Sequence, residues 1–219
     1  MLQVQTRTTT WRTPPTAWRG CLPLHRHHGI AERCAVPHIT GPLDKMRDER
    51  VLVILDVENL TISTRQTGYE LIYPKLAQRL VSASRSACLH AVLSVDPSDA
   101  RDREFMEQSG ITIHTRNIQY LPSGRKAANA DNLLAFKAGA LVTRSTASLV
   151  ILGSGDGQLS DDLAQFIKTL PGKREVMTLS VAGSTSSLLN ARINPAITEN
   201  IEIGQDVLIP AAQWRQQYE

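Results

Sequence analysis

The sequence contains little of what marks several classes of protein. Only three cysteines occur, Cys21, Cys34 and Cys88, and no two of them form a CxxC pair. The odd count argues against a disulfide framework, and the spacing argues against a structural zinc site. No apolar run approaches the ~18–20 residues of a membrane span, and no signal-peptide core lies near Met1. We therefore expect a protein of the cytoplasm, a reducing compartment, without membrane contact.

An excess of charge of one sign is also missing from most of the chain. The 219 residues carry 24 basic and 21 acidic side chains, a formal net charge of +3. Residues 1–45 hold six basic and two acidic residues, whereas residues 46–219 hold 18 basic and 19 acidic residues. The positive excess therefore belongs to the N-terminal segment, and it does not predict nucleic-acid binding by the remainder.

Residues 1–45 lack a sustained helical or alternating period and are rich in proline, threonine and arginine. Three interpretations stay open: a disordered tail, an upstream extension in front of a true start at Met46, or an organelle transit peptide. His25, His27 and His28 lie in this segment, but they have no partners at ligand spacing, so we expect no metal site there. The expected organisation is a tail, 1–45, and one folded domain, 46–219.

From residue 51 onward, strand-like and helix-like segments alternate. Val51–Leu55 is a continuous apolar, β-branched run, which is typical of a strand covered on both faces in a parallel sheet. Further strands are expected at 89–95, 111–115, 149–152, 176–181 and 201–203. Helices are expected at 73–84, 98–108, 130–142 and 159–170, with a short one at 188–189 and a polar loop at 124–129. This order predicts a single α/β domain with three layers and a mostly parallel sheet.

Acidic residues follow two of these strands. Asp56 ends the first apolar run, and Asp156 lies in a Gly-Ser-Gly-Asp-Gly run after the strand at 149–152. Asp131 begins a helix whose preceding loop should open on the same rim, where ligands bind in open parallel sheets. Three carboxylates without paired cations repel one another unless a divalent cation binds or one is protonated. Hard oxygen ligands suit Mg²⁺ or Mn²⁺, and Asn59 is placed to hold a substrate phosphate.

Each carboxylate also has a purely structural interpretation. Asp56 can cap the loop after its strand, and Asp131 can favour a helix N-terminus through the helix dipole. Asp156 lies between two glycines and can be an ordinary turn residue. Spacing alone does not separate these interpretations from a metal site.

Three segments resemble the NYN domain family, the nuclease-like branch of the PIN-like superfamily. The run Val-Leu-Val-Ile-Leu-Asp-Val-Glu-Asn-Leu at 51–60 is similar to the family's apolar strand followed by Asp-x-x-Asn. Residues 126–131 and the helix after them resemble its central block with Lys and Asp. Residues 150–156 resemble its strand followed by Ser-Gly-Asp. The resemblance covers residues 50–205 of this chain.

The resemblance implies a PIN-like, Rossmann-like fold and a metal-dependent ribonuclease. Carried over residue by residue, the catalytic residues are Asp56, Asn59, Asp131 and Asp156, and the three aspartates hold Mg²⁺ or Mn²⁺. Ser154 is expected to shape the substrate site. Arg125 and Lys126, near the presumed rim, are expected either to meet RNA phosphates or to be part of a solvated loop.

Two positions depart from the family pattern. Gln158 stands where the family often has a second acid after Ser-Gly-Asp, and Lys137 stands where it often has an Asp on the central helix. Asp161 and Asp162 are near, but three or four residues move a carboxylate by a full helical turn. Lys137 lies about 240° around the helix from Asp131, so we expect it to miss the acidic cluster. We therefore expect the site to have fewer acidic residues than the family pattern.

Three rival functions stay open beside the ribonuclease. They are a non-catalytic RNA-binding or regulatory protein, a toxin-like nuclease controlled by a partner, and a Rossmann-like nucleotide-binding protein. The last is suggested by three alternating glycines from Gly153 to Gly157, but a dinucleotide fingerprint has its glycines at the first strand's turn. There, Asp56 and Glu58 would repel a pyrophosphate. The expected partner is RNA, and a second copy of the chain or a regulatory protein is left open.

Overall fold

The structure is a computed structural model that describes residues 43–95, 101–120, 126–127 and 130–218. The histidines at 25, 27 and 28, Arg125 and nearly all of the expected tail lie outside the described residues. Val36–Glu219 form one unit. Its first described element is a 3-10 helix, η1 (Leu43–Met46), whose Met46 is fully buried in the core. The division of the chain at residue 46 stays a prediction.

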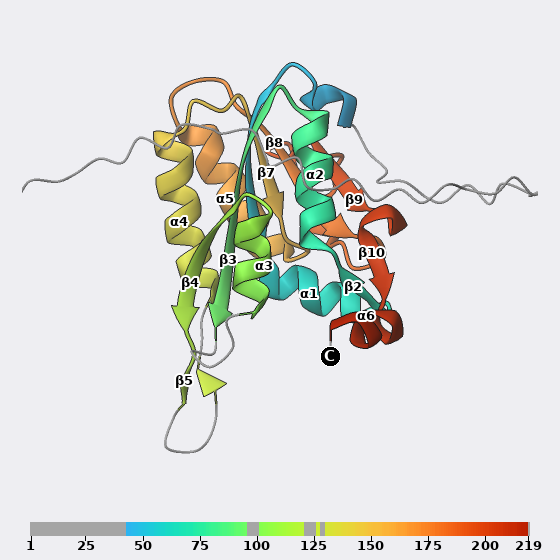
Figure 1. Cartoon of the computed structure of the whole chain (residues 1–219). Helices are drawn as coiled ribbons and strands as arrows, with labels where there is room; N and C mark the ends of the chain where they lie inside the picture. The colour runs from blue at the N-terminus through green and yellow to red at the C-terminus, as the bar shows by residue number, and fades with distance from the viewer. Residues whose placement is uncertain (1–42, 96–100, 121–125, 128–129, 219) are drawn as a thin grey trace, which may run out of the picture. The chain divides into compact units, whose positions relative to one another are not determined.

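Six strands form one parallel sheet in the order β4-β3-β1-β7-β8-β9 (Figure 1). Their bounds are β1 (Arg50–Asp56), β3 (Ser86–Val95), β4 (Ile111–Asn117), β7 (Leu149–Gly153), β8 (Glu175–Val181) and β9 (Glu199–Ile203). The chain runs from β1 outward through β3 to β4, and then returns to the other side of β1 for β7, β8 and β9. The predicted parallel α/β sheet is confirmed.

The central strand β1 is apolar on both faces because both faces are covered. Val51, Val53 and Leu55 pack in one hydrophobic cluster, and Leu52 and Ile54 pack in a second one on the opposite face. A strand covered on both sides has no solvent-facing positions, which explains why its sequence does not alternate.

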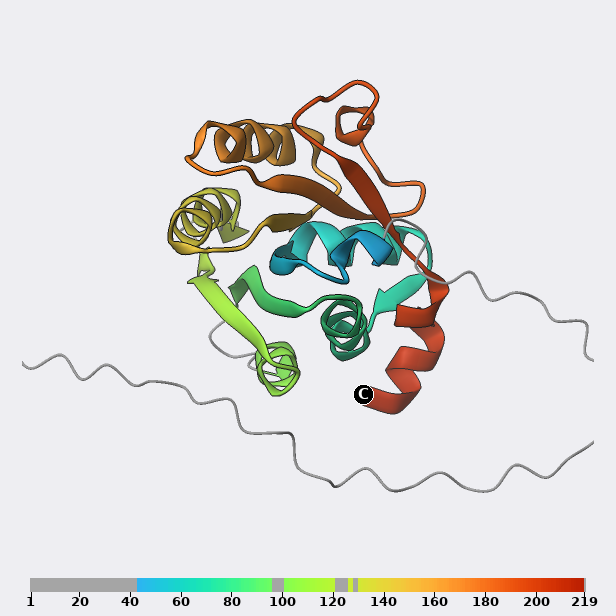
Figure 2. The same ribbon diagram turned by 90° about the horizontal axis from the view of Figure 1, so that it is seen from above.

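Helices form the two outer layers, as the view in Figure 2 shows. They are α1 (Val57–Gln66), α2 (Tyr73–Ala83), α3 (Arg101–Gln108), α4 (Ala130–Arg144), α5 (Gly157–Thr169) and α6 (Ala211–Tyr218). On one face of the sheet, α1, α2 and α3 bury Leu60, Leu76 and Met106. On the other face, α4 and α5 bury Leu134 and Ala164. None of the helices in the described part of the chain is long and apolar enough to cross a membrane.

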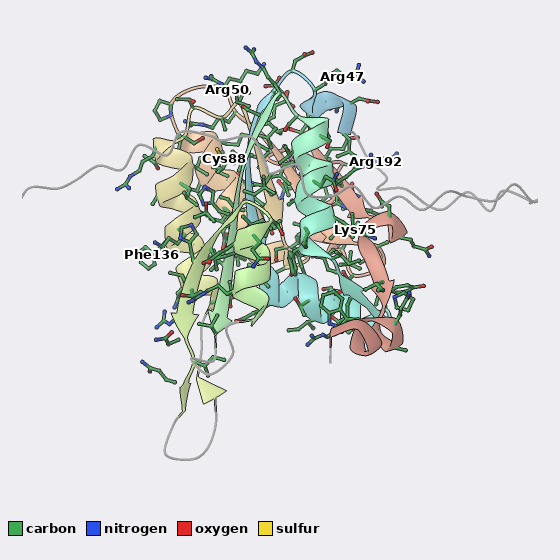
Figure 3. All side chains as sticks on the ribbon, viewed as in Figure 1. Arg47, Arg50, Lys75, Cys88, Phe136 and Arg192 are labelled. Atoms are coloured by element: carbon green, nitrogen blue, oxygen red, sulfur yellow. The ribbon has the colours of Figure 1, made fainter. Side chains whose placement is uncertain are left out.

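Helix α4 shows how one apolar stripe fixes a helix against the sheet. Ala130, Leu134, Ala138 and Val142 recur every four residues and are buried. Phe136 lies on another side of the same helix, is 80% exposed and points away from the domain (Figure 3). The buried stripe places the N-terminal turn of α4, with Asp131, at the carboxyl end of the sheet.

Several elements differ from the sequence expectation. Helix α1 is not predicted, because its segment is mostly polar. It nevertheless buries Ser63 and Thr64, and the Thr64 hydroxyl donates to the carbonyl of Leu60 at 3.0 Å. Burying a hydroxyl that is hydrogen-bonded in this way costs much less free energy than burying one without a partner.

Short elements are the other differences. The prediction of a polar loop at 124–129 is wrong for residues 126 and 127. These residues form β6 (Lys126–Ala127), which pairs antiparallel with β5 (Gln119–Tyr120). A second small ladder joins β2 (Tyr69–Leu71) to β10 (Leu208–Pro210). Two further 3-10 helices are η2 (Ser187–Leu189) and η3 (Gln205–Val207). Strands of two or three residues are too short to show a period in the sequence.

Candidate functional site

The strand order reverses between β1 and β7, which are neighbours in the sheet although β3 and β4 separate them in the chain. In open α/β sheets, ligands bind beyond the carboxyl ends of the strands at such a reversal. Asp56 is the last residue of β1, and Ser154 is the first residue after β7. The topology therefore brings two of the predicted site residues together at the position where this fold class binds ligands.

The side chain of Asp56 is buried, with 4% of its surface exposed, and both of its carboxylate oxygens accept hydrogen bonds. Oδ1 accepts from the backbone N–H of Asn59 at 3.1 Å, which makes Asp56 the N-cap of α1. Oδ2 accepts from the hydroxyl of Ser154 at 3.1 Å. The capping role of Asp56 is present, but only one oxygen is needed for it. The second oxygen ties the end of β1 to the end of β7.

Asn59 links the first turn of α1 to the loop after β7. Its Oδ1 accepts from the backbone N–H of Gly155 at 2.6 Å. A Cβ atom at residue 155 would lie 3.1 Å from that oxygen and 3.2 Å from the carbonyl oxygen of Ser184. Glycine at this position therefore permits the close approach of the loop to Asn59.

Asp156 has a structural role on α5. Its Oδ1 accepts from the backbone N–H groups of Gln158 and Leu159 at 2.9 and 3.2 Å, so it is the N-cap of the helix. Its own N–H donates to the Ser154 hydroxyl at 3.2 Å. Asp156 is exposed and connects to Asp56 through Ser154. Its interpretation as a metal ligand stays a prediction that would use the other carboxylate oxygen.

Two further carboxylates act on Asp56. Asp131 lies in the first turn of α4, and Glu58 lies in the first turn of α1. The Oε1 atom of Glu58 accepts from the backbone N–H of Ser94, near the end of β3, at 2.7 Å. Glu58 is absent from the predicted site residues. The sequence did contain a signal for it, because Glu58 is a second acidic residue between Asp56 and Asn59 of the Asp-x-x-Asn segment.

Burial, opposed in part by hydrogen bonds, raises the pKa of Asp56 from 3.8 to about 6. The bonds from Asn59 and Ser154 favour the charged form and lower the pKa, whereas the negative charges of Asp131 and Glu58 raise it further. The folded chain therefore holds a carboxylate that is costly to ionise and has acidic neighbours.

The Lys137 ammonium does not supply the missing positive charge. Across the segments that the structure describes, Lys137 makes no ion pair with Asp56 or Asp156. It acts instead on His114 of β4, whose pKa is lowered first by burial and then by the Lys137 charge. Lys137 thus lies away from the acidic residues, in agreement with its angular separation from Asp131 on the helix.

His114 stacks on His90 of β3 with 5.3 Å between ring centroids, and His90 Nδ1 lies 3.2 Å from His114 Nε2. Burial, followed by the charge of His114, lowers the pKa of His90 from 6.5 to about 4. Both imidazoles are therefore neutral in the folded chain at pH 7. The N–H group of one ring donates a hydrogen bond to the unprotonated nitrogen of the other.

We expect this histidine pair to reduce stability in acid. The unfolded chain takes up protons at its histidines from about pH 6.5 downward, whereas folded His90 does so only near pH 4. The free energy of unfolding should therefore fall between these values. His90→Gln, which stays neutral and can still hydrogen-bond to His114, should flatten that fall. Denaturant titrations from pH 7 to pH 4 measure it, and parallel pH curves for both proteins would contradict the expectation.

Of the two aspartates near the start of α5, Asp161 is already engaged in hydrogen bonds with other side chains. Asp161 Oδ1 accepts from Asn194 Nδ2 at 2.6 Å and from Gln165 Nε2 at 3.3 Å. The contact with Asn194 attaches α5 to the segment after η2, and the one with Gln165 lies within the helix. Asp162 is exposed one residue further along the helix.

The donor set suits a divalent cation that keeps most of its water. Among the described residues, no group of three His, Cys, Asp or Glu side chains is arranged to hold a metal ion. The acidic side chains near Asp56 nevertheless supply only hard oxygen donors, and no described cation neutralises them. Mg²⁺ in proteins is commonly bound through one or two carboxylates, several waters and substrate phosphates. The residues present fit that mode better than a protein cage.

Of the two predicted phosphate contacts, the backbone of Lys126 lies in β6, which extends from the carboxyl end of the sheet with β5 (Figure 1). Arg125 precedes β6 outside the described residues. Their contacts with RNA stay predictions.

One solved structure supports this architecture. A solved structure of a protein of unknown function from Vibrio parahaemolyticus matches with a TM-score of 0.58 and 21% identity, over 74% of this chain and 96% of that chain. A short-chain dehydrogenase/reductase from Veillonella parvula, in complex with NADP, gives a TM-score of only 0.32 at 16% identity, over 62% and 49% of the two chains. The first likeness shows the fold alone. No curated protein matches the chain.

The family comparison covers the whole region that contains the site. The model of the NYN domain matches residues 50–195, from the start of β1 to the segment after η2. That range contains Asp56, Asn59, Asp131, Ser154 and Asp156, and it is more than half of the chain. This chain therefore belongs to the NYN domain family, a family of PIN-like nucleases.

Proposed function

We propose that this chain is a ribonuclease that hydrolyses phosphodiester bonds of RNA with the help of Mg²⁺ or Mn²⁺. Membership of the NYN family supports a nuclease-like function related to RNA. The observation that carries the proposal is the Asp56 carboxylate, buried at the reversal of the strand order beside Asp131 and Glu58. A bound cation offsets the cost of keeping such a carboxylate charged, so the site favours cation binding.

In the proposed site, Asp56 and Asp131 hold the cation, with Asp156 as the third ligand and Glu58 as an added acidic neighbour. The Ser154 hydroxyl and the Asn59 backbone fix the orientation of the Asp56 carboxylate. When bound, the cation supplies Lewis-acid stabilisation of the phosphate charge and lowers the pKa of water.

The remaining roles belong to groups around the carboxylates. Asn59 Oδ1 holds the loop after β7 in place, and its Nδ2 group donates to no described residue. That amide is suited to meet a phosphate oxygen. In this proposal, Lys126 of β6 and Arg125, the residue before it in the sequence, supply positive charge for the RNA backbone.

The decisive experiment measures cleavage of a labelled single-stranded RNA by the purified full-length chain. We expect slow cleavage that is faster with millimolar Mn²⁺ than with Mg²⁺, because Mn²⁺ binds a given site more tightly. EDTA should abolish it. Asp56→Asn should reduce the rate by about 100-fold or more, and Ser154→Ala by roughly 10–100-fold, the usual effect of losing a group that orients a metal ligand.

Two aspartate variants sharpen this test. Asp156→Asn should keep the cap of α5, because asparagine is also a good N-cap, so a loss of rate would report the missing charge. Asp162→Asn removes an exposed charge within the helix and should cleave as the natural chain does. Cleavage that persists in Asp56→Asn would show a contaminating nuclease or another site.

A non-catalytic RNA-binding protein is the second candidate. It is favoured by the absence of a three-ligand group in the part of the chain that the structure describes, and by Gln158 in place of an acid. RNA binding without cleavage at any Mn²⁺ concentration would select it. The cytoplasmic location and a second copy or a regulatory protein as partner also stay predictions.

A further inference from the structure

A small pocket is lined by residues of α1, β2, α2, α3 and α6. Its lining includes Arg65, Glu70, Tyr73, Met106 and Trp214. Val57, the residue that directly follows Asp56, also lines it, so the pocket begins one residue from the proposed cleavage site. The space is about 50 Å³, which admits the edge of one six-membered ring rather than a fused bicyclic base.

The aromatic part of the pocket is held in place. The Tyr73 hydroxyl lies 3.1 Å from Thr61 Oγ1 and donates to the carbonyl oxygen of Val57 at 3.3 Å. These contacts fix the Tyr73 ring against α1. Trp214, on α6, is partly exposed and contributes a second ring. Tyr73 is buried, so Trp214 is the ring of the pair that can stack on a nucleic-acid base, and such stacking tolerates any base.

The polar part of the pocket is an ion pair that can read the edge of a base. Arg65 Nε donates to Glu70 Oε1 at 2.8 Å. The Arg65 side chain is 60% exposed, whereas that of Glu70 is 15% exposed. Guanidinium has five N–H donors and a carboxylate has two acceptor oxygens. The pair therefore keeps donors and an acceptor for a ligand that carries both kinds of group on one edge, as cytosine and uracil do.

We propose that this pocket binds one pyrimidine base of the RNA, stacked on Trp214 and hydrogen-bonded to Arg65 and Glu70, with the buried Tyr73 ring as part of the wall. The proposal rests on the proposed RNA-directed function and adds a subsite with a base preference. The pocket lies next to the proposed cleavage site in the chain, because Val57, which follows Asp56, is one of its lining residues. The same chemistry would accept a free pyrimidine nucleotide, so the test includes one.

The test uses the fluorescence of Trp214 in the full chain. Of the three tryptophans, Trp11 and Trp18 are replaced by phenylalanine, so that Trp214 alone reports. Ten-residue oligonucleotides of cytidine, uridine or adenosine are added in EDTA, so that cleavage does not interfere. We expect the pyrimidine oligonucleotides to quench Trp214 and to bind roughly tenfold more tightly than the adenosine one, the usual value of a base-edge contact.

Glu70→Gln is the main variant, because it removes the charge of the acceptor and keeps its size. It should weaken pyrimidine binding by roughly tenfold and remove the preference over adenosine. Glu199→Gln is the matched control, since Glu199 also forms an exposed ion pair. Glu199 on β9 pairs with Lys45 on η1 at 2.6 Å, and neither residue lines the pocket. This control should bind as the reference protein does. Equal thermal stability of the two variants excludes a folding defect.

Each outcome bears on one proposal. No quenching by either pyrimidine oligonucleotide, or no effect of Glu70→Gln on binding, would overturn the pocket even if RNA is cleaved. Pyrimidine-specific quenching without any cleavage would support the pocket and count against the ribonuclease. Cytidine monophosphate that binds as tightly as the oligonucleotide would show a free-nucleotide site and overturn the RNA subsite.

Discussion

Asp56→Asn is expected to make the chain more stable at pH 8 while it removes cleavage. The pKa of folded Asp56 is raised from 3.8 to about 6, so the folded chain prefers the protonated, uncharged form. Stability from this preference is complete below about pH 4 and is lost as the pH rises through 6. Asparagine keeps the uncharged state at every pH. The free energy of unfolding should therefore rise by up to about 3 kcal/mol above pH 6, at 1.36 kcal/mol per pKa unit.

The gain should appear as a melting temperature higher by up to roughly 6–12 °C, at about 2–4 °C per kcal/mol for a chain of this size. It should shrink toward zero as the pH approaches 4. Asp162→Asn, at an exposed position, should leave the melting temperature unchanged at both pH values. Millimolar Mn²⁺ should stabilise the natural chain and not Asp56→Asn. A variant that melts below the natural chain at pH 8 would show that the charge of Asp56 is already compensated.

Gly157→Ala is expected to cost about 1–3 kcal/mol of unfolding free energy, the usual effect of forcing a methyl group into a filled space. Gly157 is buried at the first position of α5, and a Cβ atom there would lie 2.6 Å from the Cβ of Ser186 and 3.0 Å from the Cβ of Leu188. The Ser186 hydroxyl would be closer still. Backbone, rather than a flexible side-chain end, must therefore move to admit the methyl group.

A second substitution makes the steric cause testable. Ser186→Gly removes the atoms nearest to the new methyl group, so it should restore part of the stability of Gly157→Ala, although it also removes the cap that Ser186 gives to η2. Gly139→Ala is the control, since its Cβ would lie an ordinary 3.7 Å from Phe166. Alanine inside a helix should there add up to about 1 kcal/mol. Thermal melts of the four proteins suffice, and an unchanged Gly157→Ala would refute the clash.

The parts of the fold that the sequence predicts are those where burial alone decides the pattern. Residues 51–55 and 149–152 are apolar because they lie in strands covered on both faces, and each is found as a strand. Residues 176–181 also form a buried strand, although Thr178 and Ser180 are polar. Helix α1 is not predicted because two of its buried residues, Ser63 and Thr64, are polar, and a sequence pattern assigns polar residues to the solvent-facing side. The β2–β10 ladder joins segments far apart in sequence, and local patterns cannot show such pairing. The β5 and β6 strands lie close in sequence, but two residues are too few to show a period.

Some features of the candidate site can likewise be predicted from the sequence, and others cannot. The positions of Asp56 and Ser154 at one end of the sheet follow from strands that end in polar residues, and a parallel sheet gathers such ends. The capping contacts of Asp156, the hydrogen bond between Asn59 and Gly155, and the place of Glu58 beside Ser94 depend on side-chain directions after each strand. Those directions are set by packing between elements, which a single sequence does not display.

The parallel order of the sheet also has a consequence for how the chain acquires its structure during synthesis. Strand β1 is made early, but its neighbour β7 follows roughly a hundred residues later, so that edge of β1 has no partner until then. At 5–20 residues per second, the wait is roughly 5–20 s. During it, the five consecutive apolar residues Val51–Leu55 are open to wrong pairing. A ribosome-bound chain that ends before Leu149 should thus aggregate or recruit chaperones more readily than one that includes β7.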